Sequence, residues 1–505
     1  MRFRGPLADS YPAAVALVVF ALIPYLALSS AITPLTPVLS KSLPLSKQAL
    51  QLTIGMANAA YAFGTVLAVQ FAVHLRGRRM LVLYASLSVL GSVMTALAPV
   101  PGLFVAGHIL QGLTTSLMLI AAVPPLVIGW PTSKMPWTAV TMNLCVFGAV
   151  ALGPVIGGLQ AAAGAWRPLF WIVAGLSALA LLFVVLTFED QPPADRTAPW
   201  DMVAIVLAGG GSAAAFFGAS ELLTHPLLSV IVLVPLLAGV GAIVALVVVQ
   251  YRIKHPLMPV RQASTTFPVA GMVIAICAGA ASVGVITLAQ TGLQTKPPAH
   301  VAILFLPEFA TALLSAALFG SLFRTRFVPL LAVAGTIMLA AGAAVLAGAV
   351  AGSDAIVLVG SGLVGLGVGS SVSPALFIAG FSLRSAQIQR IFALVELLRG
   401  FAAFITAPLL LRLAMTASTN PRAGIGTALW VCFGIAAAAG LTATALFVLG
   451  RARLRRPDLD RWEQGDEPAW ESPPLLARVR GTRRHGDHSA SSPTDARRAS
   501  PTRAS

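Results

Sequence analysis

Ionisable side chains inside long apolar segments are the residues of this sequence best placed to do chemistry. They are Glu308, Glu396, Arg399 and His108, and the stretches around them hold almost no other charge. A charged group surrounded by hydrocarbon is costly, so such residues are candidates for function by default. A buried carboxyl group can exchange a proton, and a carboxylate beside an arginine can form an ion pair.

Glu308 follows Pro307 near the start of an apolar stretch over 301–323. It has no charged partner three or four residues away on a helix, where a side-chain pair would meet. We expect it to load a proton from the outer side of a membrane. The alternative is a carboxylate that a local kink holds near the outer water.

The other candidates come in pairs. Glu396 and Arg399 are three residues apart, and therefore neighbours on one helix face. They are either a structural or gating salt bridge or part of a proton site. His108 shares a face with Gln111, and it either exchanges hydrogen bonds within a cavity or caps a contact between helices.

The composition indicates what kind of protein surrounds these ionisable residues. Of 505 residues, 57% are hydrophobic and 10% are charged, whereas a soluble domain averages about 25% charged residues. The chain is therefore predicted to be an integral membrane protein. Its net charge of +16 is spread over many loops, as topology signals are, and we expect no nucleic-acid partner. Three cysteines in apolar runs are expected to be buried thiols rather than disulfides or metal ligands.

Apolar runs long enough to cross a bilayer predict an all-α protein with about fourteen transmembrane helices. Each is about 20 residues long, and none alternates as a barrel strand would. The first, 12–32, is longer than the core of a secretory signal and is interpreted as a retained span. The predicted spans are 12–32, 52–73, 80–99, 103–126, 138–161, 168–187, 202–220, 226–250, 266–290, 301–323, 328–350, 355–380, 391–413 and 426–449.

Basic residues orient the spans. With the N-terminus inside, fourteen Lys and Arg residues fall in inner segments and five in outer loops. The excess of positive charge on the inside predicts that both termini are cytoplasmic. We expect the protein to lie in the inner (plasma) membrane.

Repeated features predict four regions. A basic loop follows the second span and another follows the tenth, while Pro154 and Pro408 lie at matching depths in the fifth and thirteenth spans. We therefore expect a six-helix bundle over 1–190, two extra helices over 191–262 and a second six-helix bundle over 263–450. Residues 451–505 are predicted to form a disordered basic cytoplasmic tail. Its first segment, RARLRR, is either a simple inside anchor or a contact for anionic lipids.

Small residues and a proline mark the fifth span as pliable. The run GAVALGPVIGG contains Gly148, Gly153, Pro154, Gly157 and Gly158. Glycines four apart let helices approach closely, and proline removes a backbone hydrogen bond. We expect this helix to take part in conformational change.

Residues 148–172, GAVALGPVIGGLQAAAGAWRPLFWI, resemble the fifth-span motif of major facilitator superfamily antiporters. With fourteen spans, the chain is similar to the fourteen-span drug:proton antiporter branch. The resemblance covers about residues 10–450 and implies two six-helix bundles around a pathway lined by spans 1, 4, 9 and 12.

Other family motifs are present in altered form. The loop after the second span keeps Gly77, Arg78 and Arg79, but His74 stands where the family has an aspartate that helps to latch the cytoplasmic gate. His108 replaces the fourth-span arginine that the family uses in proton relay. In the first span, Ser29 and Ser30 stand where the branch has an acidic residue followed by threonine.

These features predict a secondary active transporter that exports a small hydrophobic compound against protons, as a monomer without a cofactor. No Walker A loop is present, so an ion gradient would supply the energy. The missing first-span acid favours an alternative, a passive or lipid-moving facilitator of the same fold. A multi-span membrane enzyme and a non-transporting sensor are further alternatives, although the outer loops offer few carboxylates for catalysis.

Overall fold

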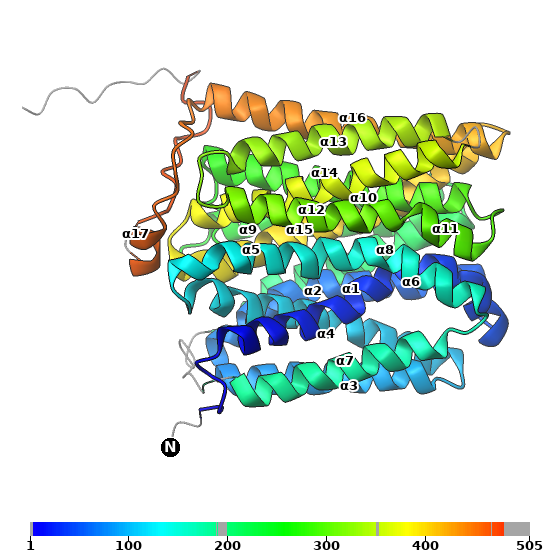
Figure 1. Cartoon of the computed structure of the whole chain (residues 1–505), viewed down its shortest axis with the longest axis horizontal. Coiled ribbons are helices and arrows are strands. Elements are labelled where there is room, and N and C mark those ends of the chain that lie inside the picture. The colour runs from blue at the N-terminus through cyan, green and yellow to red at the C-terminus, as the bar shows by residue number, and fades with distance from the viewer. Residues whose placement is uncertain (1–3, 188, 190–198, 350–352, 466, 479–505) are drawn as a thin grey trace, which may run out of the picture.

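The computed structural model describes residues 4–187, 189, 199–349, 353–465 and 467–478. Fourteen helices in these ranges are long and apolar enough to cross a membrane, which confirms the predicted number of spans. The fold is all-α, and the helices lie side by side along one direction (Figure 1). Such helices satisfy their backbone hydrogen bonds internally, as a lipid environment requires.

The first six spans are built from seven α-helices, because the fifth span contains a π-helical turn. They are α1 (Tyr11–Ser42), α2 (Lys47–His74), α3 (Gly77–Leu97), α4 (Pro101–Ile128), α5 (Met135–Asn143) with the π-helix η2 (Leu144–Gly148) and α6 (Ala149–Ala162), and α7 (Arg167–Thr187). A short 3-10 helix, η1 (Thr132–Lys134), precedes α5. Helix α1 runs ten residues beyond its predicted end, through Pro34 and Pro37.

The central pair is α8 (Met202–Ser220), followed by the 3-10 helix η3 (Glu221–Leu223), and α9 (Val230–Arg252). The last six spans are α10 (Thr266–Gly292), α11 (Pro298–Leu304) with α12 (Leu306–Leu322), α13 (Val328–Ala349), α14 (Asp354–Phe381), α15 (Ile388–Thr416) and α16 (Pro421–Leu449). Helix α8 packs on α9, and also on α2 of the first half and α15 of the second.

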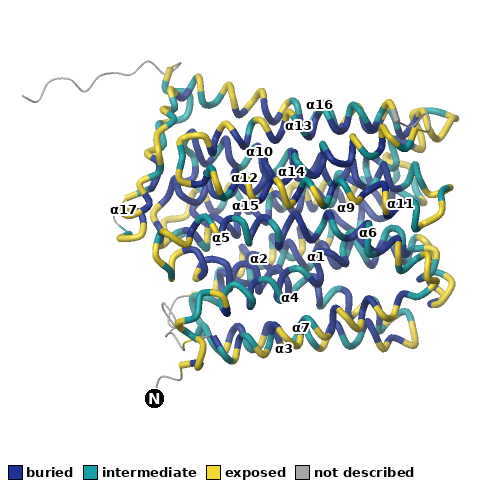
Figure 2. Tube along the Cα trace, viewed as in Figure 1, coloured by how far each residue is buried: buried dark blue, intermediate teal, exposed yellow. Residues whose placement is uncertain are grey.

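The two ends of the bundle differ. The first described residues and the segments 450–465 and 467–478 lie at the same end, on the left in Figure 1, which we call the terminal face. The loops 43–46, 163–166, 293–297 and 417–420 lie at the other end, the distal face. Buried residues concentrate in the inner helices, while α3, α7 and α16 expose much of their surface (Figure 2). That exposed surface is apolar, as lipid contact requires.

The structure of the C-terminal segment corrects the expectation that this segment is disordered. Residues 457–465 and 467–478 were predicted to be disordered, but they pack against the terminal face and include the short helix α17 (Leu459–Gln464). Trp462 is fully buried and its Nε1 donates to the carbonyl of Leu383 at 2.8 Å. Asp460 accepts from Thr132 Oγ1 at 2.9 Å, so the tail also touches the first half. Two tryptophans bury enough apolar surface to hold this otherwise polar segment; residues 479–505 lie outside the described ranges.

Candidate functional site: a cavity between the two halves

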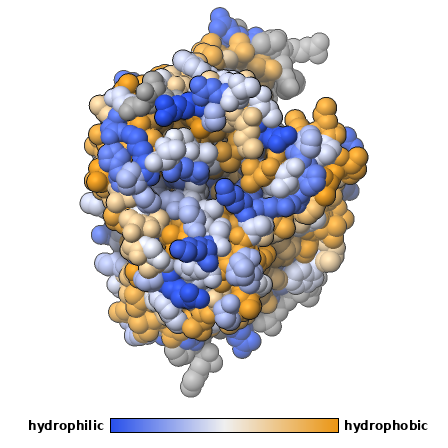
Figure 3. All heavy atoms as spheres, turned by 90° about the vertical axis from the view of Figure 1, so that its right-hand side faces the viewer, coloured by the Kyte–Doolittle hydropathy of each residue, from blue (hydrophilic) through white to orange (hydrophobic). Residues whose placement is uncertain are grey.

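A cavity of about 150 Å³ lies between the two six-helix halves. Its lining comes from α1, α2, η2 and α6 on one side, from α10, α12, α14 and α15 on the other, and from α8. Thr33, Gln51 and Gln290, near the distal ends of their helices, belong to this lining. Figure 3 looks onto the distal face, where polar residues gather in the middle and hydrophobic ones lie around the sides.

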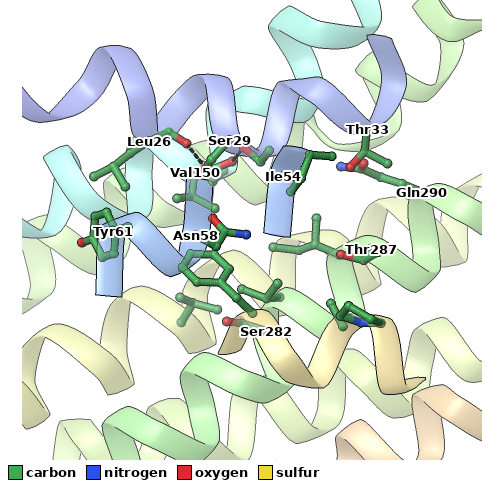
Figure 4. A pocket seen from close by; sticks show the side chains of 18 of the residues that line it. Leu26, Ser29, Thr33, Ile54, Asn58, Tyr61, Val150, Ser282, Thr287 and Gln290 are labelled. Carbon is green, nitrogen blue, oxygen red and sulfur yellow. Dashed lines mark hydrogen bonds between the residues drawn. The ribbon is translucent and has the colours of Figure 1, made fainter. Parts of the chain in front are cut away.

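Uncharged polar side chains line much of the cavity. Figure 4 shows Ser29, Asn58, Ser282 and Thr287 around one space, together with the amide of Gln290. Ser29 Oγ donates to the carbonyl of Leu26 at 2.7 Å within its own helix. No described residue hydrogen-bonds to the buried Nε2 of Gln290. Apolar walls with a few polar groups are typical of sites that hold small organic molecules.

Glu308 lines this cavity just after a break in the tenth span. Helix α11 ends at Leu304, and α12 begins at Leu306 with Pro307 in its first turn. The Glu308 side chain is 2% exposed, and its Oε2 has no hydrogen-bond partner among the described residues. Thr311 Oγ1 ties this turn to α14 by donating to the carbonyl of Gly362 at 2.7 Å. The break between α11 and α12 places this carboxyl group, which has no partner among the described residues, at the cavity.

Glu396 and Arg399 form a buried ion pair on α15. Arg399 Nη2 lies 2.5 Å from Glu396 Oε2, and its Nε lies 3.1 Å from Oε1, so the contact is bidentate. Tyr61 of α2 donates to Glu396 Oε2 at 3.3 Å, and the guanidinium lies 5.7 Å from the ring centre of Phe147. Arg399 lines the cavity and Glu396 lies behind it. The pair thus contacts aromatic residues of the other half.

The fifth span shows why its glycines and proline occur together. Pro154 has no N–H to donate to the carbonyl of Val150, and Ser30 Oγ donates to that carbonyl instead, at 2.6 Å. Gly153 makes this contact possible, because a Cβ there would lie 1.9 Å from Ser30 Oγ. The π-helical turn η2 precedes this point. Ser30 therefore lines the cavity, but its hydroxyl group donates a hydrogen bond to the neighbouring helix α6.

The remaining glycines of this span differ in their surroundings. A Cβ on Gly157 would lie 2.4 Å from the carbonyl oxygen of Ala31 in α1, and one on Gly158 would lie 2.8 Å from that of Pro298 in α11. A Cβ on Gly148 would make only ordinary contact with its own helix. Gly157 and Gly158 thus let α6 lie directly on backbone of both halves.

The structure places His108 and Gln111 away from the cavity lining. His108 Nδ1 lies 3.2 Å from Gln111 Oε1, and Gln111 Nε2 donates to Ser92 Oγ at 3.1 Å. Ser92 in turn contacts Ser177 of α7 at 3.2 Å. This buried network joins α3, α4 and α7, so the geometry agrees with the alternative of a contact between helices.

The loop motif after the second span lies at the terminal face. The His74 ring stacks on Trp200 with 4.5 Å between ring centres, and Gly77 begins α3 with Arg78 and Arg79 in its first turn. Gln70 Oε1 accepts from the backbone N–H of Asp201 at 3.4 Å. His74, which stands where the family's aspartate is expected, thus contacts Trp200 in the segment that leads into α8.

Sequence reasoning missed several lining residues. Phe216 and Ser220 of α8 line the cavity, and Phe216 packs edge-on against Phe401 of α15 at 5.9 Å. A Cβ on Gly55 of α2 would lie 2.3 Å from Ser220 Oγ. Asn58 and Gln290 could have been noticed as amides within apolar spans. Little in the α8 sequence distinguishes the face that meets the cavity, because apolar residues surround nearly the whole helix.

The fold and the cavity define a class: membrane proteins whose two six-helix halves enclose a site between them. Residues 18–306, more than half of the chain, match the Major Facilitator Superfamily model, and the chain belongs to that family. Within the described ranges, no cluster of three or more His, Cys, Asp or Glu side chains could hold a metal ion.

Curated relatives include an MFS-type transporter and two resistance proteins. The chain is 30% identical over 207 residues to the uncharacterized MFS-type transporter YubD and 29% identical over 177 residues to the lincomycin resistance protein LmrB, both of Bacillus subtilis (strain 168). These matches cover 41% and 34% of this chain, and the chain spans 40% and 36% of the relatives' lengths. It is also 25% identical to the multidrug resistance protein Stp of Mycobacterium tuberculosis, over 68% of this chain and 64% of that protein.

Solved structures share the fold. A POT family transporter in complex with 5-aminolevulinic acid aligns with a TM-score of 0.62 at 13% identity, covering 87% of this chain and 96% of the other. The human organic anion transporter MFSD10 (TETRAN) aligns with a TM-score of 0.61 at 13% identity, covering 86% and 99%.

Proposed function

We propose that this protein is a secondary transporter that exports small lipophilic compounds by alternating access and couples export to protons through Glu308. The supporting observation is the buried, unpartnered carboxyl group at a cavity between the two halves. The multidrug and lincomycin resistance proteins among its relatives support a drug-like substrate. The terminal face would be cytoplasmic, and the distal face would lie outside.

The cavity lining supports a lipophilic substrate with few charges. Glu308 and Arg399 are the ionisable groups at its wall apart from Tyr61, and Glu396 neutralises Arg399 through two close contacts. A substrate would therefore meet apolar walls, uncharged hydrogen-bonding groups and one carboxyl group that can take up a proton. Proton binding and substrate binding at this group would exclude one another, which links the two flows.

The test measures transport in proteoliposomes of purified protein. A lipophilic fluorescent dye is the substrate, and several pH gradients are imposed. The native protein should move the dye faster as the gradient rises. Glu308→Gln, which keeps the shape but cannot release a proton, should lose this gradient-driven component while folding normally.

Glu221→Gln is the matched control. Glu221 is also buried, at 5% exposure, but it accepts a hydrogen bond from Gln48 Nε2 at 2.9 Å and does not line the cavity. This variant should keep gradient-driven transport. Full activity of Glu308→Gln would remove Glu308 from the proposal.

A passive facilitator of the same fold is the second candidate. The observation that favours it is the first span, where Ser29 and Ser30 both donate to backbone carbonyls and no acid lines the cavity from α1. If the native rate constant ignores the imposed gradient while dye still equilibrates, the facilitator is the correct function.

A further inference from the structure

A second cavity, of about 410 Å³, lies at the terminal face where the two halves and the central pair meet. Its walls come from the end of α2, the segment that enters α8, the loop between α9 and α10, and the start of α15. It shares no lining residue with the central cavity. The lining residues used below are Asp201, Lys254, His255, Gln262, Gln387 and Arg390.

Basic groups outnumber the available acidic groups in this cavity. Asp201 is the acidic residue of the lining, and its carboxylate is already occupied, because it accepts from Gln250 Nε2 at 2.7 Å and from the N–H of Ala204 at 2.9 Å. Lys254 and Arg390 form no ion pair with any described residue. A guanidinium, an ammonium and an imidazole therefore share this space with one carboxylate, and none of them forms an ion pair with it.

This donor set fits an anion with several oxygen atoms. Arginine recognises phosphate through two parallel hydrogen bonds, and lysine adds a compact positive charge. The amides of Gln387 and Gln262 lie in the same lining and can donate further hydrogen bonds. A phosphate group matches these donors better than a carboxylate, which offers one oxygen pair.

The surroundings indicate that the phosphate belongs to a lipid. Lys254 and His255 directly follow α9, whose outer surface is apolar and exposed at Val244, Val248 and Tyr251. Acyl chains could lie along this surface while the headgroup enters the cavity. Basic pockets between membrane helices at the cytoplasmic side are typical sites for anionic headgroups.

We propose that this cavity binds the phosphate headgroup of an anionic membrane lipid, held by Lys254 and His255 on one side and Arg390 on the other. These residues belong to different parts of the chain: Arg390 starts α15 of the second half, and Lys254 follows the central pair. Because α2 of the first half completes the wall, the lipid stabilises the arrangement of the two halves that this structure shows. A ligand that binds one conformation shifts the population towards it.

The test uses purified full-length protein in lipid nanodiscs and measures the midpoint of thermal unfolding. Nanodiscs of phosphatidylcholine alone are compared with nanodiscs that contain phosphatidylglycerol, and a third sample receives inorganic phosphate in phosphatidylcholine. The native protein should unfold several degrees higher with phosphatidylglycerol than without it. The double variant Lys254→Gln/Arg390→Gln should lose this shift.

The control is Arg252→Gln/Arg261→Gln, which removes two charges from the same stretch without touching the cavity lining. It should keep the shift. An equal loss in the control, or an unchanged shift in the cavity variant, would overturn the proposal. A shift produced by inorganic phosphate alone would assign the site to a soluble anion and overturn the lipid assignment. The readout needs no transport, so it is independent of the proposed function.

Discussion

The two buried carboxyl groups near the central cavity have opposite surroundings. Glu396 on α15 is held by Arg399 and by the hydroxyl of Tyr61, while Glu308 on α12 has an oxygen with no described partner. Both are at most 3% exposed. Burial alone therefore does not distinguish the two carboxyl groups, whereas their hydrogen-bond partners do.

The difference follows from the helices that carry the two groups. Helix α15 is continuous at Glu396, so an arginine one turn later reaches the carboxylate and both charges are neutralised within one element. The tenth span is interrupted at Phe305, and Glu308 falls in the first turn of α12 with no basic residue one turn away. Glu308 therefore has no counter-charge on its own helix.

The largest expected effect comes from breaking the paired site. Arg399→Ala leaves Glu396 buried without its counter-charge, which should lower the free energy of unfolding by about 3 to 5 kcal/mol. The double variant Glu396→Gln/Arg399→Gln removes both charges and should recover most of that loss. Thermal unfolding and the folded yield on size-exclusion chromatography measure both. A stable Arg399→Ala protein would show that Glu396 is not structural.

A smaller effect is expected from the tyrosine that joins the pair to the other half. Tyr61→Phe removes the hydrogen bond to Glu396 and should cost about 1 to 2 kcal/mol of unfolding free energy. Tyr84→Phe is the matched control, since Tyr84 is equally buried and its hydroxyl has no partner within the described residues. Equal losses in both variants would mean that the contact with Glu396 contributes nothing.

The smallest effect on stability is expected at the unpartnered site. Glu308→Gln removes no described hydrogen bond from Oε2, so its unfolding free energy should change by less than about 1 kcal/mol. The same thermal measurement checks it, beside Glu396→Gln, which should be strongly destabilising because Arg399 stays buried. Similar losses in the two variants would contradict the distinction drawn between the two carboxyl groups.

The spans and the ion pair were predictable because they depend on local pattern. Each span needs only a long apolar run, and Glu396 and Arg399 meet because residues three apart share a helix face. For Glu308 the sequence left two interpretations open, a carboxyl group that loads a proton and a carboxylate that a local kink holds near the outer water. The hydrogen bond from Ser30 to Val150 was not predictable, although the sequence marks Pro154, because the donor lies 120 residues away.

The composition of the C-terminal segment led to a wrong prediction of disorder. Residues 457–478 contain many charged and proline residues, which predicted disorder. Trp462 and Trp470 nevertheless find buried places beside Phe381, at 4.5 and 6.0 Å between ring centres. The average composition of the segment does not reveal that two tryptophan side chains pack into sites formed by other helices.

By itself, the sequence determined that the chain has about fourteen segments able to cross a membrane and that a few acids lie within them. These properties follow from the free energy of placing each residue in hydrocarbon, which acts locally. Only the tertiary structure decided that Glu308 lines the central cavity and that His108 does not. It also decided that α8 forms part of the wall of this cavity, and that Lys254 and Arg390 line a second cavity together. Those outcomes depend on which helices pack against one another, and this packing joins segments that are far apart in the sequence.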